Sequence, residues 1–394
     1  MKRFLFFFLS LILTIQCVTL GTLASDGDPA ADPVDQGMQT AADLMVDARG
    51  AILIEASTGS VLFEQNADEA FPPASVTKIM TLLLVMEALD SGRIKWTDPV
   101  PVSEYAASMG GSQVFLSPGE TLSVEDMVKC TVISSANDAA VAIAEFLSGS
   151  EATFVSDMNR RAEELGMKNA HFENVTGLDD TTIDHRCSAR DIAIMSRELI
   201  RHKDILKYSS IWMDSIRGGA FTLSNTNRLI RFYSGATGLK TGSTAKAKFC
   251  LSATAERNGM TLIAVVMGSP SRDVRNEEAK RLLDYGFSSY SLYVHEPTSL
   301  TPLKVPGGVL DRCSIVFDRF ETVVNRGEAD QVKVVYILPD SLPAPVSSGD
   351  IVGKVVFRLG EKVIGESPIR TAESVARISY PILLYRLFRS FVMA

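Results

Sequence analysis

The pattern of apolar and polar positions first predicts a β-hairpin and then a buried helix. In the stretch AILIEASTGSVLFEQNA, residues 51–67, two apolar runs flank a Ser-Thr-Gly turn, which is typical of a hairpin. Pro72 and Pro73 cannot continue a helix but suit the entry to one, and residues 79–89 are apolar at almost every position. We therefore expect a helix that begins near Ser75 and is buried on nearly all sides.

The middle of the chain reads as a helical lobe followed by strands. Between Ser103 and Leu206, apolar positions at helical spacing alternate with polar turns. Ser123 and Ser188 each stand three positions before an aspartate, which is the spacing of a helix N-cap. In AKFCLSATAERNGMTLIAVVMG, an Asn-Gly pair separates two β-rich runs and predicts a tight hairpin. The run RNEEAKRLLDYGF predicts an amphipathic helix that closes the first domain.

The pattern changes again after Leu300. Short alternating runs such as VKVVYIL and IVGKVVFRL, broken by Pro and Gly, predict a small all-β domain. The final stretch ARISYPILLYRLFRSFVMA is apolar but carries Arg386 and Arg389, so it is too short and too charged to span a bilayer. We expect an amphipathic helix in the membrane interface, with docking on the protein's own surface as the alternative.

Composition and the N-terminal residues narrow the class of protein. The 394 residues are 46% hydrophobic and 22% charged, which is an ordinary globular composition. The net charge of −8 offers no basic face for nucleic acid. Lys2 and Arg3 precede an apolar run that ends in a small-x-Ala site at Ala24, the layout of a secretory signal peptide. An uncleaved N-terminal anchor is the alternative.

Cysteine and histidine positions offer no metal site or catalytic triad. After the signal peptide the cysteines are Cys130, Cys187, Cys250 and Cys313, with none of the short spacings of metal ligands. We expect buried single thiols, although an exported protein can form disulfides whose pairing the sequence does not give. The four histidines are scattered, and we expect a structural hydrogen bond from His185 in its polar loop.

Three short motifs supply candidate chemistry. Ser75 and Lys78 are three residues apart and share a helix face, so the lysine can take the proton that makes the serine a nucleophile. This pattern arises by chance, and residues 243–246 match it equally well. Context favours the first match, because Ser135-Ala136-Asn137 precedes a predicted helix and Lys240-Thr241-Gly242 precedes the predicted hairpin.

Together, S-x-x-K, S-x-N and K-T-G are the signature of the penicillin-recognising serine enzymes. The segments PPASVTKIMT, SSANDAAVAIAE, HFENVTGLDD, SARDIA and TGLKTGSTAKAKFCLSATA resemble the D-alanyl-D-alanine carboxypeptidases of the low-molecular-mass penicillin-binding proteins. The resemblance covers nearly all of the mature chain. It implies an α/β penicillin-binding, β-lactamase-like transpeptidase domain with an antiparallel sheet and a helical lobe, a small C-terminal all-β domain and an amphipathic C-terminal helix.

The resemblance also implies roles for single residues. Ser75 attacks the carbonyl between the two terminal D-alanines of a peptidoglycan stem peptide, and Lys78 is its base. Burial, the helix N-terminus and Lys240 as a second cation disfavour the ammonium form of Lys78. Ser135 relays the proton to the leaving D-alanine, and Asn137 positions the substrate amide and Lys78. No cofactor or metal is implied.

Substrate binding is implied for the K-T-G strand and for one arginine. Thr241 and Gly242 belong to this group, and the backbone N–H groups of Ser75 and Ser243 would bind the oxyanion. Arg275 stands at the family's spacing for the arginine that binds the substrate carboxylate, with Arg272 as its nearest rival.

The chain departs from the family pattern at four positions: Ala136 and Lys248 stand where glycine is usual, Val175 where proline is common and Thr237 where aspartate is frequent. If position 136 requires a positive φ, its methyl group would cost on the order of 1 kcal/mol. None of the four carries a reacting group, so we still expect an active enzyme. The alternatives are a β-lactamase-like hydrolase, although we find no glutamate pattern for rapid deacylation, and a catalytically idle cell-wall scaffold, although the motif residues are intact.

The complete expectation is an exported enzyme at the outer face of the cytoplasmic membrane and the cell wall, held peripherally. Its partners would be stem peptides ending in D-Ala-D-Ala, β-lactam antibiotics and, through the C-terminal helix, the membrane surface. The expected organisation is a signal peptide (1–24), a flexible leader (25–44), a catalytic domain (45–292), a small β domain (300–372) and a membrane-associating tail (375–394).

Overall fold

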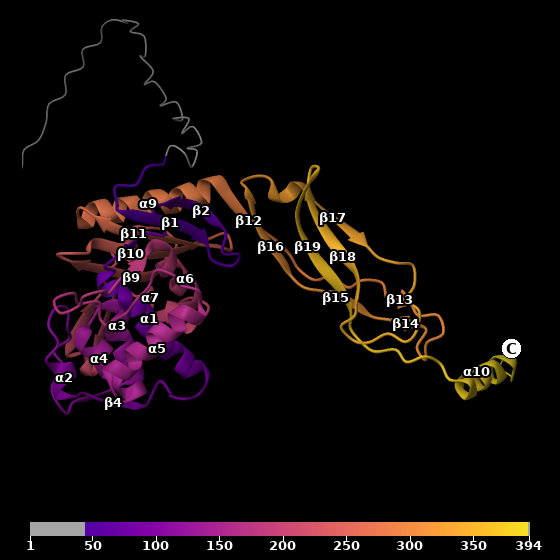
Figure 1. Cartoon of the computed structure of the whole chain (residues 1–394), viewed down its shortest axis with the longest axis horizontal. Helices are drawn as coiled ribbons and strands as arrows, with labels where there is room; N and C mark the ends of the chain where they lie inside the picture. The colour runs from indigo at the N-terminus through magenta and orange to yellow at the C-terminus, as the bar shows by residue number, and fades with distance from the viewer. Residues whose placement is uncertain (1–43, 393–394) are drawn as a thin grey trace, which may run out of the picture. The chain divides into compact units, whose positions relative to one another are not determined.

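The structure is a computed structural model that describes residues 44–392 (Figure 1). The predicted signal peptide and nearly all of the predicted leader lie outside the described residues. The domain boundaries proposed from the sequence therefore stay predictions, and the elements are described here as the structure has them.

A five-stranded antiparallel sheet forms the frame of the catalytic region. Its strand order is β2-β1-β11-β10-β9. The bounds are β1 (Gly50–Glu55), β2 (Val61–Gln65), β9 (Ala236–Thr244), β10 (Lys248–Arg257) and β11 (Met260–Ser269). Both predicted hairpins are confirmed, since β1 pairs with β2 and β10 with β11. Asn258 and Gly259 both have positive φ, 52° and 76°, as a tight hairpin turn requires.

The sheet is buried on both faces. Alternate residues of β1 enter different cores: Ile52 and Ile54 pack with the helical lobe, whereas Ala51 and Leu53 pack with α9 (Arg272–Ser289). This separation follows from the two-residue repeat of a strand. Figure 1 shows α9 on one side of the sheet and the helical lobe on the other. The predicted closing helix is confirmed and extends to Ser289.

The helical lobe surrounds α1, as the apolar pattern predicts. Its helices are α1 (Lys78–Asp90), α2 (Glu104–Ala107), α3 (Val124–Ile133), α4 (Asn137–Ser148), α5 (Glu151–Glu164), α6 (Ala189–Leu199) and α7 (Asp204–Ser209). The predicted caps are present, because Ser123 Oγ accepts from Asp126 N and Ser188 forms a reciprocal capping box with Asp191. Ten of the thirteen α1 residues are buried, including Lys78.

Short elements lie among the helices of the lobe. They are β3 (Ala70–Phe71) paired with β6 (Cys187–Ser188), β4 (Pro99–Pro101) with β5 (Thr121–Ser123), and β7 (Met213–Ile216) with β8 (Phe221–Ser224). The remaining pieces are the 3₁₀ turns η2 (Ala74–Thr77) and η3 (Arg217–Gly219) and the short helix α8 (Leu229–Phe232). Ser75 therefore lies in a 3₁₀ turn leading into α1, rather than in the α-helix itself as expected.

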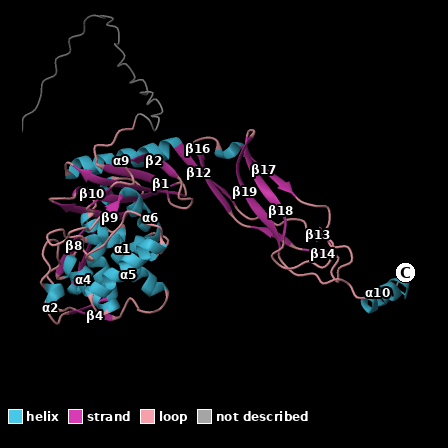
Figure 2. Cartoon of the chain, in the orientation of Figure 1, coloured by secondary structure: helices cyan, strands magenta, loops and turns pink. Residues whose placement is uncertain are grey.

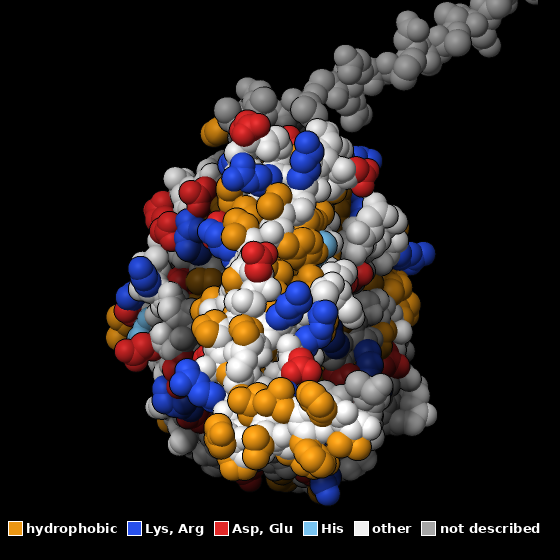
Figure 3. Space-filling view, turned by 90° about the vertical axis from the view of Figure 1, so that its right-hand side faces the viewer, with side chains coloured by type: hydrophobic (Ala, Val, Ile, Leu, Met, Phe, Trp, Pro, Cys, Tyr) orange, Lys and Arg blue, Asp and Glu red, His pale blue; other side chains and the backbone are white. Residues whose placement is uncertain are grey.

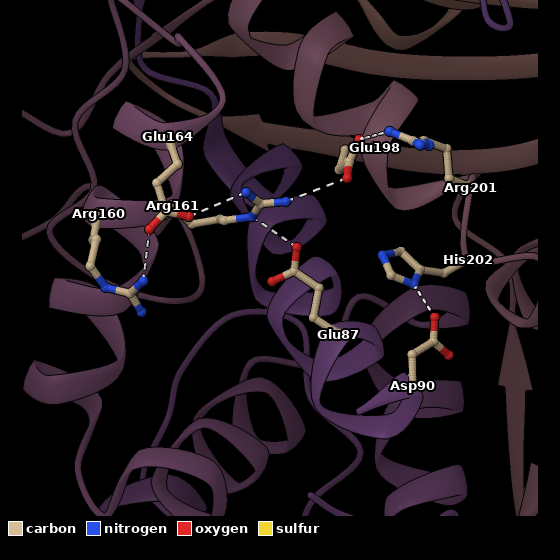
Figure 4. A network of polar contacts seen from close by, with 8 residues as sticks. All are labelled: Glu87, Asp90, Arg160, Arg161, Glu164, Glu198, Arg201 and His202. Atoms are coloured by element: carbon tan, nitrogen blue, oxygen red, sulfur yellow. Dashed lines mark hydrogen bonds and ion pairs between the residues drawn. The ribbon is translucent and has the colours of Figure 1, made fainter. Parts of the chain in front are cut away.

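A network of ion pairs ties the C-terminal half of α1 to its neighbours (Figure 4). Arg161 on α5 contacts Glu87 of α1 at 2.8 Å, Glu164 of its own helix at 3.2 Å and Glu198 of α6 at 3.4 Å. Its side chain is only 21% exposed. One guanidinium group thus links three helices, and α1 carries Lys78 at its other end.

Strands joined by loops make up most of the chain between α9 and the C-terminal helix (Figure 2). A four-stranded sheet has the order β15-β19-β18-β17. Two further pairs are β12 with β16 and β13 with β14. The bounds are β12 (Tyr290–His295), β13 (Leu303–Lys304), β14 (Arg312–Cys313), β15 (Ile315–Phe317), β16 (Phe320–Asn325), η4 (Ala329–Gln331), β17 (Val332–Ile337), β18 (Ile351–Leu359) and β19 (Lys362–Thr371). Phe357, Val355 and Ile369 lie at the centre of their core.

The chain ends in α10 (Tyr380–Val392), an amphipathic helix. Its exposed apolar side chains include Leu384, Tyr385, Phe388 and Phe391. Figure 3 shows hydrophobic side chains gathered where α10 lies. Within residues 44–392, every helix is too short or too polar to span a bilayer.

Candidate active site

The backbone around Ser75 is held in an unusual conformation. Ala74, just before it, is buried and has φ +49°, a region that residues with a side chain rarely adopt. Val76 N then donates to Pro73 O at 3.2 Å, which closes the 3₁₀ turn. The double proline and this turn place Ser75 at the surface of a cavity of about 600 Å³.

Lys78 lies directly beneath Ser75. Its side chain is fully buried, and Nζ is 2.9 Å from Ser75 Oγ, 2.6 Å from Asn137 Oδ1 and 2.9 Å from the carbonyl oxygen of Thr176. Burial lowers the pKa of Lys78 well below its usual value, and the nearby charge of Lys240 lowers it further. The structure thus places an amine with weakened basicity beside the serine hydroxyl.

Asn137 begins α4 and holds Lys78 from the opposite side. Its Nδ2 donates to Gly110 O at 2.7 Å, which fixes the amide so that Oδ1 faces Lys78. Ser135, two residues earlier, has φ +61°, and its side chain lines the cavity with Ser75. No hydrogen bond of the Ser135 hydroxyl is found within residues 44–392. The S-x-N and S-x-x-K residues are therefore brought together, as the motifs predict.

The loop that supplies the Thr176 carbonyl is itself tied to the nucleophile turn. Asn174 Oδ1 accepts from Gly177 N at 2.7 Å, and His185 Nε2 lies 2.8 Å from Thr77 Oγ1. Glu173 N donates to His185 Nδ1, so Nε2 carries the proton and donates to Thr77. Burial lowers the pKa of His185 to about 4. The expected structural role of His185 fits these contacts.

The K-T-G residues lie on β9, an edge strand of the five-stranded sheet. Lys240 is buried, its Nζ donates to Thr241 O at 2.9 Å, and burial followed by the charge of Arg275 lowers its pKa to about 7. Thr241 Oγ1 donates to Thr226 Oγ1 at 2.7 Å. A Cβ on Gly242 would lie 2.8 Å from Pro73 O and 2.9 Å from Ser75 N. Glycine is thus required where β9 meets the nucleophile turn.

Arg275 enters the same cavity from α9. It is 3% exposed, Nη2 donates to Asn276 Oδ1 at 2.9 Å and Nη1 donates to Cys250 O at 3.4 Å. Burial lowers its pKa to about 10, and the charge of Arg272 acts in the same direction. Within residues 44–392, no carboxylate forms an ion pair with Arg275. Ser243 lines the cavity as well, together with Ser75, Ser135, Thr241, Gly242 and Arg275, whereas the buried Lys78, Asn137 and Lys240 are not among the residues that line it.

The departures from the family pattern have local explanations. Ala136 has φ −60°, so the strain that a positive φ would cause is absent. Lys248, by contrast, has φ +57°. Val175 N donates to Glu151 Oε1 at 3.0 Å, a bond that a proline would not form. Thr237 Oγ1 lies 2.8 Å from Thr254 Oγ1, which joins β9 to β10.

The second S-x-x-K match is separate from any helix start. Ser243 is near the end of β9, and Lys246 lies in the turn that follows, where Nζ donates to Asp179 O at 2.7 Å. The cysteines Cys130, Cys187, Cys250 and Cys313 are buried free thiols, and Cys250 contacts the site only through its backbone carbonyl, which accepts from Arg275.

Sequence reasoning missed several contributors to the site. Thr176 contributes its backbone carbonyl oxygen. Because every residue has this group, the residue type at position 176 does not indicate the role. Trp212, Thr226 and Arg228 line the cavity from the stretch that precedes β9. The polar run SNTNR at 224–228 was the available signal, since such a run between strands is typical of a binding loop.

Comparisons with known proteins agree with this geometry. A family model described as D-alanyl-D-alanine carboxypeptidase matches residues 37–271, and one described as penicillin-binding protein 5, C-terminal domain, matches residues 304–377. The D-alanyl-D-alanine carboxypeptidase DacF of Bacillus subtilis (strain 168) is 41% identical over 380 residues, which cover 94% of this chain and 97% of the relative.

Solved structures are similar as well. Penicillin binding protein 5 from Haemophilus influenzae aligns with a TM-score of 0.75 and 32% identity, covering 84% of this chain and 98% of that one. Penicillin-Binding Protein D2 from Listeria monocytogenes, solved in an ampicillin-bound form, aligns with a TM-score of 0.55 and 32% identity over 62% of this chain and 99% of that one.

Proposed function

Since this chain belongs to the D-alanyl-D-alanine carboxypeptidase family, we propose that it removes the terminal D-alanine from peptidoglycan stem peptides through an acyl-enzyme on Ser75. The observation that carries this proposal is the buried contact between Lys78 Nζ and Ser75 Oγ, 2.9 Å apart at the wall of a cavity. A serine needs such a base, because its hydroxyl is a poor nucleophile at neutral pH.

Lys78 takes the proton from Ser75. An ordinary lysine has a pKa of roughly 10.4 and is charged, but burial and then the charge of Lys240 lower the pKa of Lys78 and favour the neutral amine, against a smaller opposing effect of Asp138. Its lone pair accepts the hydroxyl proton while Oγ attacks the carbonyl carbon between the two D-alanines. Asn137 and the Thr176 carbonyl keep the amine aimed at Oγ.

Collapse of the tetrahedral intermediate breaks the peptide C–N bond. The proton held by Lys78 passes through the Ser135 hydroxyl to the departing nitrogen, and free D-alanine leaves. Water then attacks the ester carbonyl and gives a proton to Lys78. As the ester C–O bond breaks, this proton passes to Ser75 Oγ and the shortened peptide is released. Ser75 and the neutral Lys78 are thus regenerated.

The oxyanion is stabilised by the backbone N–H groups of Ser75 and Ser243. The close packing at Gly242 supports this role, because it brings the backbone of β9 against that of the nucleophile turn. Removal of one such donor typically costs about 2.7–4 kcal/mol of transition-state stabilisation, but a side-chain change at Ser243 leaves the backbone donor in place.

Arg275 binds the C-terminal carboxylate of the substrate, and Thr241 positions the same end. A buried guanidinium without an acidic partner among the described residues is suited to an incoming carboxylate. Penicillins, which also carry a carboxylate, would enter in the same way. Their β-lactam carbonyl is attacked by Ser75, the ring C–N bond opens, and the acyl-enzyme persists.

The test is an intact-mass time course of the mature chain with benzylpenicillin, comparing wild type with Ser75→Ala. We expect a slowly lost adduct of one penicillin in wild type alone, together with release of D-alanine from a stem pentapeptide. Rapidly hydrolysed drug without a lasting adduct would support the β-lactamase alternative. Drug left untouched, with no D-alanine released, would support an idle scaffold.

We also propose that the mature chain acts outside the cytoplasm and rests peripherally on a membrane through α10. Arg389 stands among exposed apolar side chains of this helix, a composition typical of helices in the interface of anionic bilayers, whereas Arg386 is 3.1 Å from Asp311. Co-sedimentation with vesicles of anionic phospholipid would test this. We expect binding by the full chain and none after truncation at Arg377; equal behaviour would contradict it.

A further inference from the structure

The cavity around Ser75 has a one-sided charge. Three of the side chains that line it are arginines, Arg228, Arg272 and Arg275, and none is Asp or Glu. The complete chain, in contrast, carries a net charge of −8. A cavity lined by cations in an acidic protein focuses a positive potential on the ligand.

One terminal carboxylate does not account for all three arginines. Arg275 is buried and suffices for a single carboxylate through its planar pair of donors. Arg272 is exposed and forms no hydrogen bond or ion pair with any side chain in residues 44–392. Arg228 comes within only 3.9 Å of Asp273, and both of these side chains are more than half exposed, so this pairing is weak.

The three guanidinium groups are close enough to repel one another. Arg272 and Arg275 are one turn apart on α9 and share a helix face. The charges of both Arg272 and Arg228 lower the pKa of Arg275. Arg272 is also the first residue of α9, where the helix dipole disfavours a cation. Repulsion and the helix dipole both oppose the placement of three weakly paired or unpaired arginines around one cavity. An anionic group on the ligand explains why they are nevertheless found together.

Two aromatic side chains lie in the same region. Trp212 and Phe232 line the cavity, and their rings pack edge to face with centroids 6.3 Å apart. The guanidinium group of Arg231 lies over both rings, 5.6 Å and 5.5 Å from their centroids, and Phe232 is 68% exposed, so the rings carry a further cation and do not close the region off from solvent.

We propose that Arg228 and Arg272 form a second carboxylate subsite, so that the enzyme prefers stem peptides bearing a free carboxylate in addition to the C-terminal one. This inference rests on the proposed carboxypeptidase function and names its substrate class. The second carboxylate can come from the side chain of the residue before D-Ala-D-Ala or from the residue before that. Conversion of it to a carboxamide removes the charge with almost no change in shape.

The experiment measures kcat/KM for D-alanine release by the mature full chain from matched peptides. In the first pair, the residue before D-Ala-D-Ala carries either a free carboxylate or the corresponding carboxamide. In the second pair, the same change is made one residue earlier. We expect wild type to prefer the free acid in one of the pairs by about three- to tenfold, a preference that weakens with added salt.

Variants then assign the preference to the subsite. In the double variant Arg228→Gln/Arg272→Gln, the acid-to-amide ratio should fall to about one, while the carboxamide peptide is still cleaved. The double variant Arg160→Gln/Arg201→Gln also removes two charges, from exposed positions outside the cavity, and should keep the wild-type ratio. Thermal unfolding of all three proteins checks that they are folded.

The outcomes separate this inference from the proposed function. A wild-type ratio near one in both pairs, or a ratio unchanged in the double variant, would overturn the second subsite while carboxypeptidase activity stands. An equal fall of activity on acid and amide peptides in the double variant would also overturn it. Absence of D-alanine release from every peptide would overturn the proposed function and this inference with it.

Discussion

The side-chain oxygen of Asn137 lies 2.6 Å from Lys78 Nζ, and the other end of the same amide donates to Gly110 O. This orientation gives the lysine a neutral acceptor rather than a charged one. Asn137→Asp would place a carboxylate at that distance and raise the pKa of Lys78. We expect penicillin acylation at pH 7 to fall at least about tenfold, because less of the lysine is then neutral.

The pH dependence identifies the cause. In the Asn137→Asp protein the acylation rate should recover as the pH rises, because the amine again loses its proton. The neutral change Asn137→Ser should lower the acylation rate without moving the acid limb of the pH–rate profile, which is the pH range over which the rate falls on the acidic side. If Asn137→Asp lost activity equally at every pH, a change in Lys78 basicity would not be the reason.

Lys240 has the opposite electrostatic effect on Lys78. Its charge lowers the pKa of the buried amine, so Lys240→Gln should raise that pKa and shift the acid limb of the acylation profile toward higher pH. Lys246→Gln, which changes the lysine of the second S-x-x-K match, is the matched control and should leave the limb in place. A wild-type profile that stays flat from neutral pH down to about 5 would contradict a neutral-lysine mechanism.

The approach of β9 to the nucleophile turn makes Gly242 sensitive to any side chain. In Gly242→Ala the methyl group would meet backbone atoms at 2.8–2.9 Å, so Ser75 and the strand must separate. We expect acylation to fall at least tenfold, since a displacement of about 1 Å can reduce catalysis a hundredfold. Gly259→Ala, in the β10–β11 turn at φ +76°, should lower the melting temperature without reducing acylation of the folded protein.

His185 should make the stability of the protein depend on acidic pH. Its folded pKa of about 4 lies below the usual 6.5, so between these values the unfolded chain binds more protons. The free energy of unfolding is therefore unaffected above about pH 7 and falls as the pH drops, by on the order of 3 kcal/mol at pH 4. Denaturant melts of wild type and His185→Gln across this range measure the effect. Parallel pH dependences would show that another group is responsible.

The Arg161 network should contribute to stability and not to chemistry. Arg161→Gln leaves Glu87, Glu198 and Glu164 without their shared cation, and we expect a loss of about 1–2 kcal/mol in the free energy of unfolding. Arg160→Gln is the matched control on the same helix, because Arg160 is 62% exposed and should change stability by less than about 0.5 kcal/mol. Penicillin acylation at 25 °C should be the same in both.

Much of the fold followed from local pattern. The Asn-Gly turn at 258–259 and the capping box at Ser188 each depend on neighbouring residues alone, and both are present. The motifs also identified side chains that meet in space, because the residue types were restricted by the chemistry. The 3₁₀ turn at Ser75 was not predicted, since it depends on the positive φ of Ala74 and on contact with Gly242, far away in the chain.

Other parts of the site could not be predicted from residue type. The Thr176 carbonyl could have been supplied by any residue, so its hydrogen bond to Lys78 is visible only in three dimensions. Arg228 looks like an ordinary surface arginine in the sequence, and only the cavity brings it near Arg275, whereas Arg272 lies one turn away on the same helix. Whether a positive φ falls at Ser135 or Ala136 depends on tertiary packing around that turn.

The contact at Gly242 also makes the active site a late product of folding. Lys78 needs partners 59 and 98 positions further along the chain, and the nucleophile turn needs β9, which follows both. A partly folded chain therefore carries the serine without the surroundings that activate it. A fluorescent penicillin would thus act as a conformational probe, since covalent labelling of Ser75 would count only molecules in which the edge strand has docked.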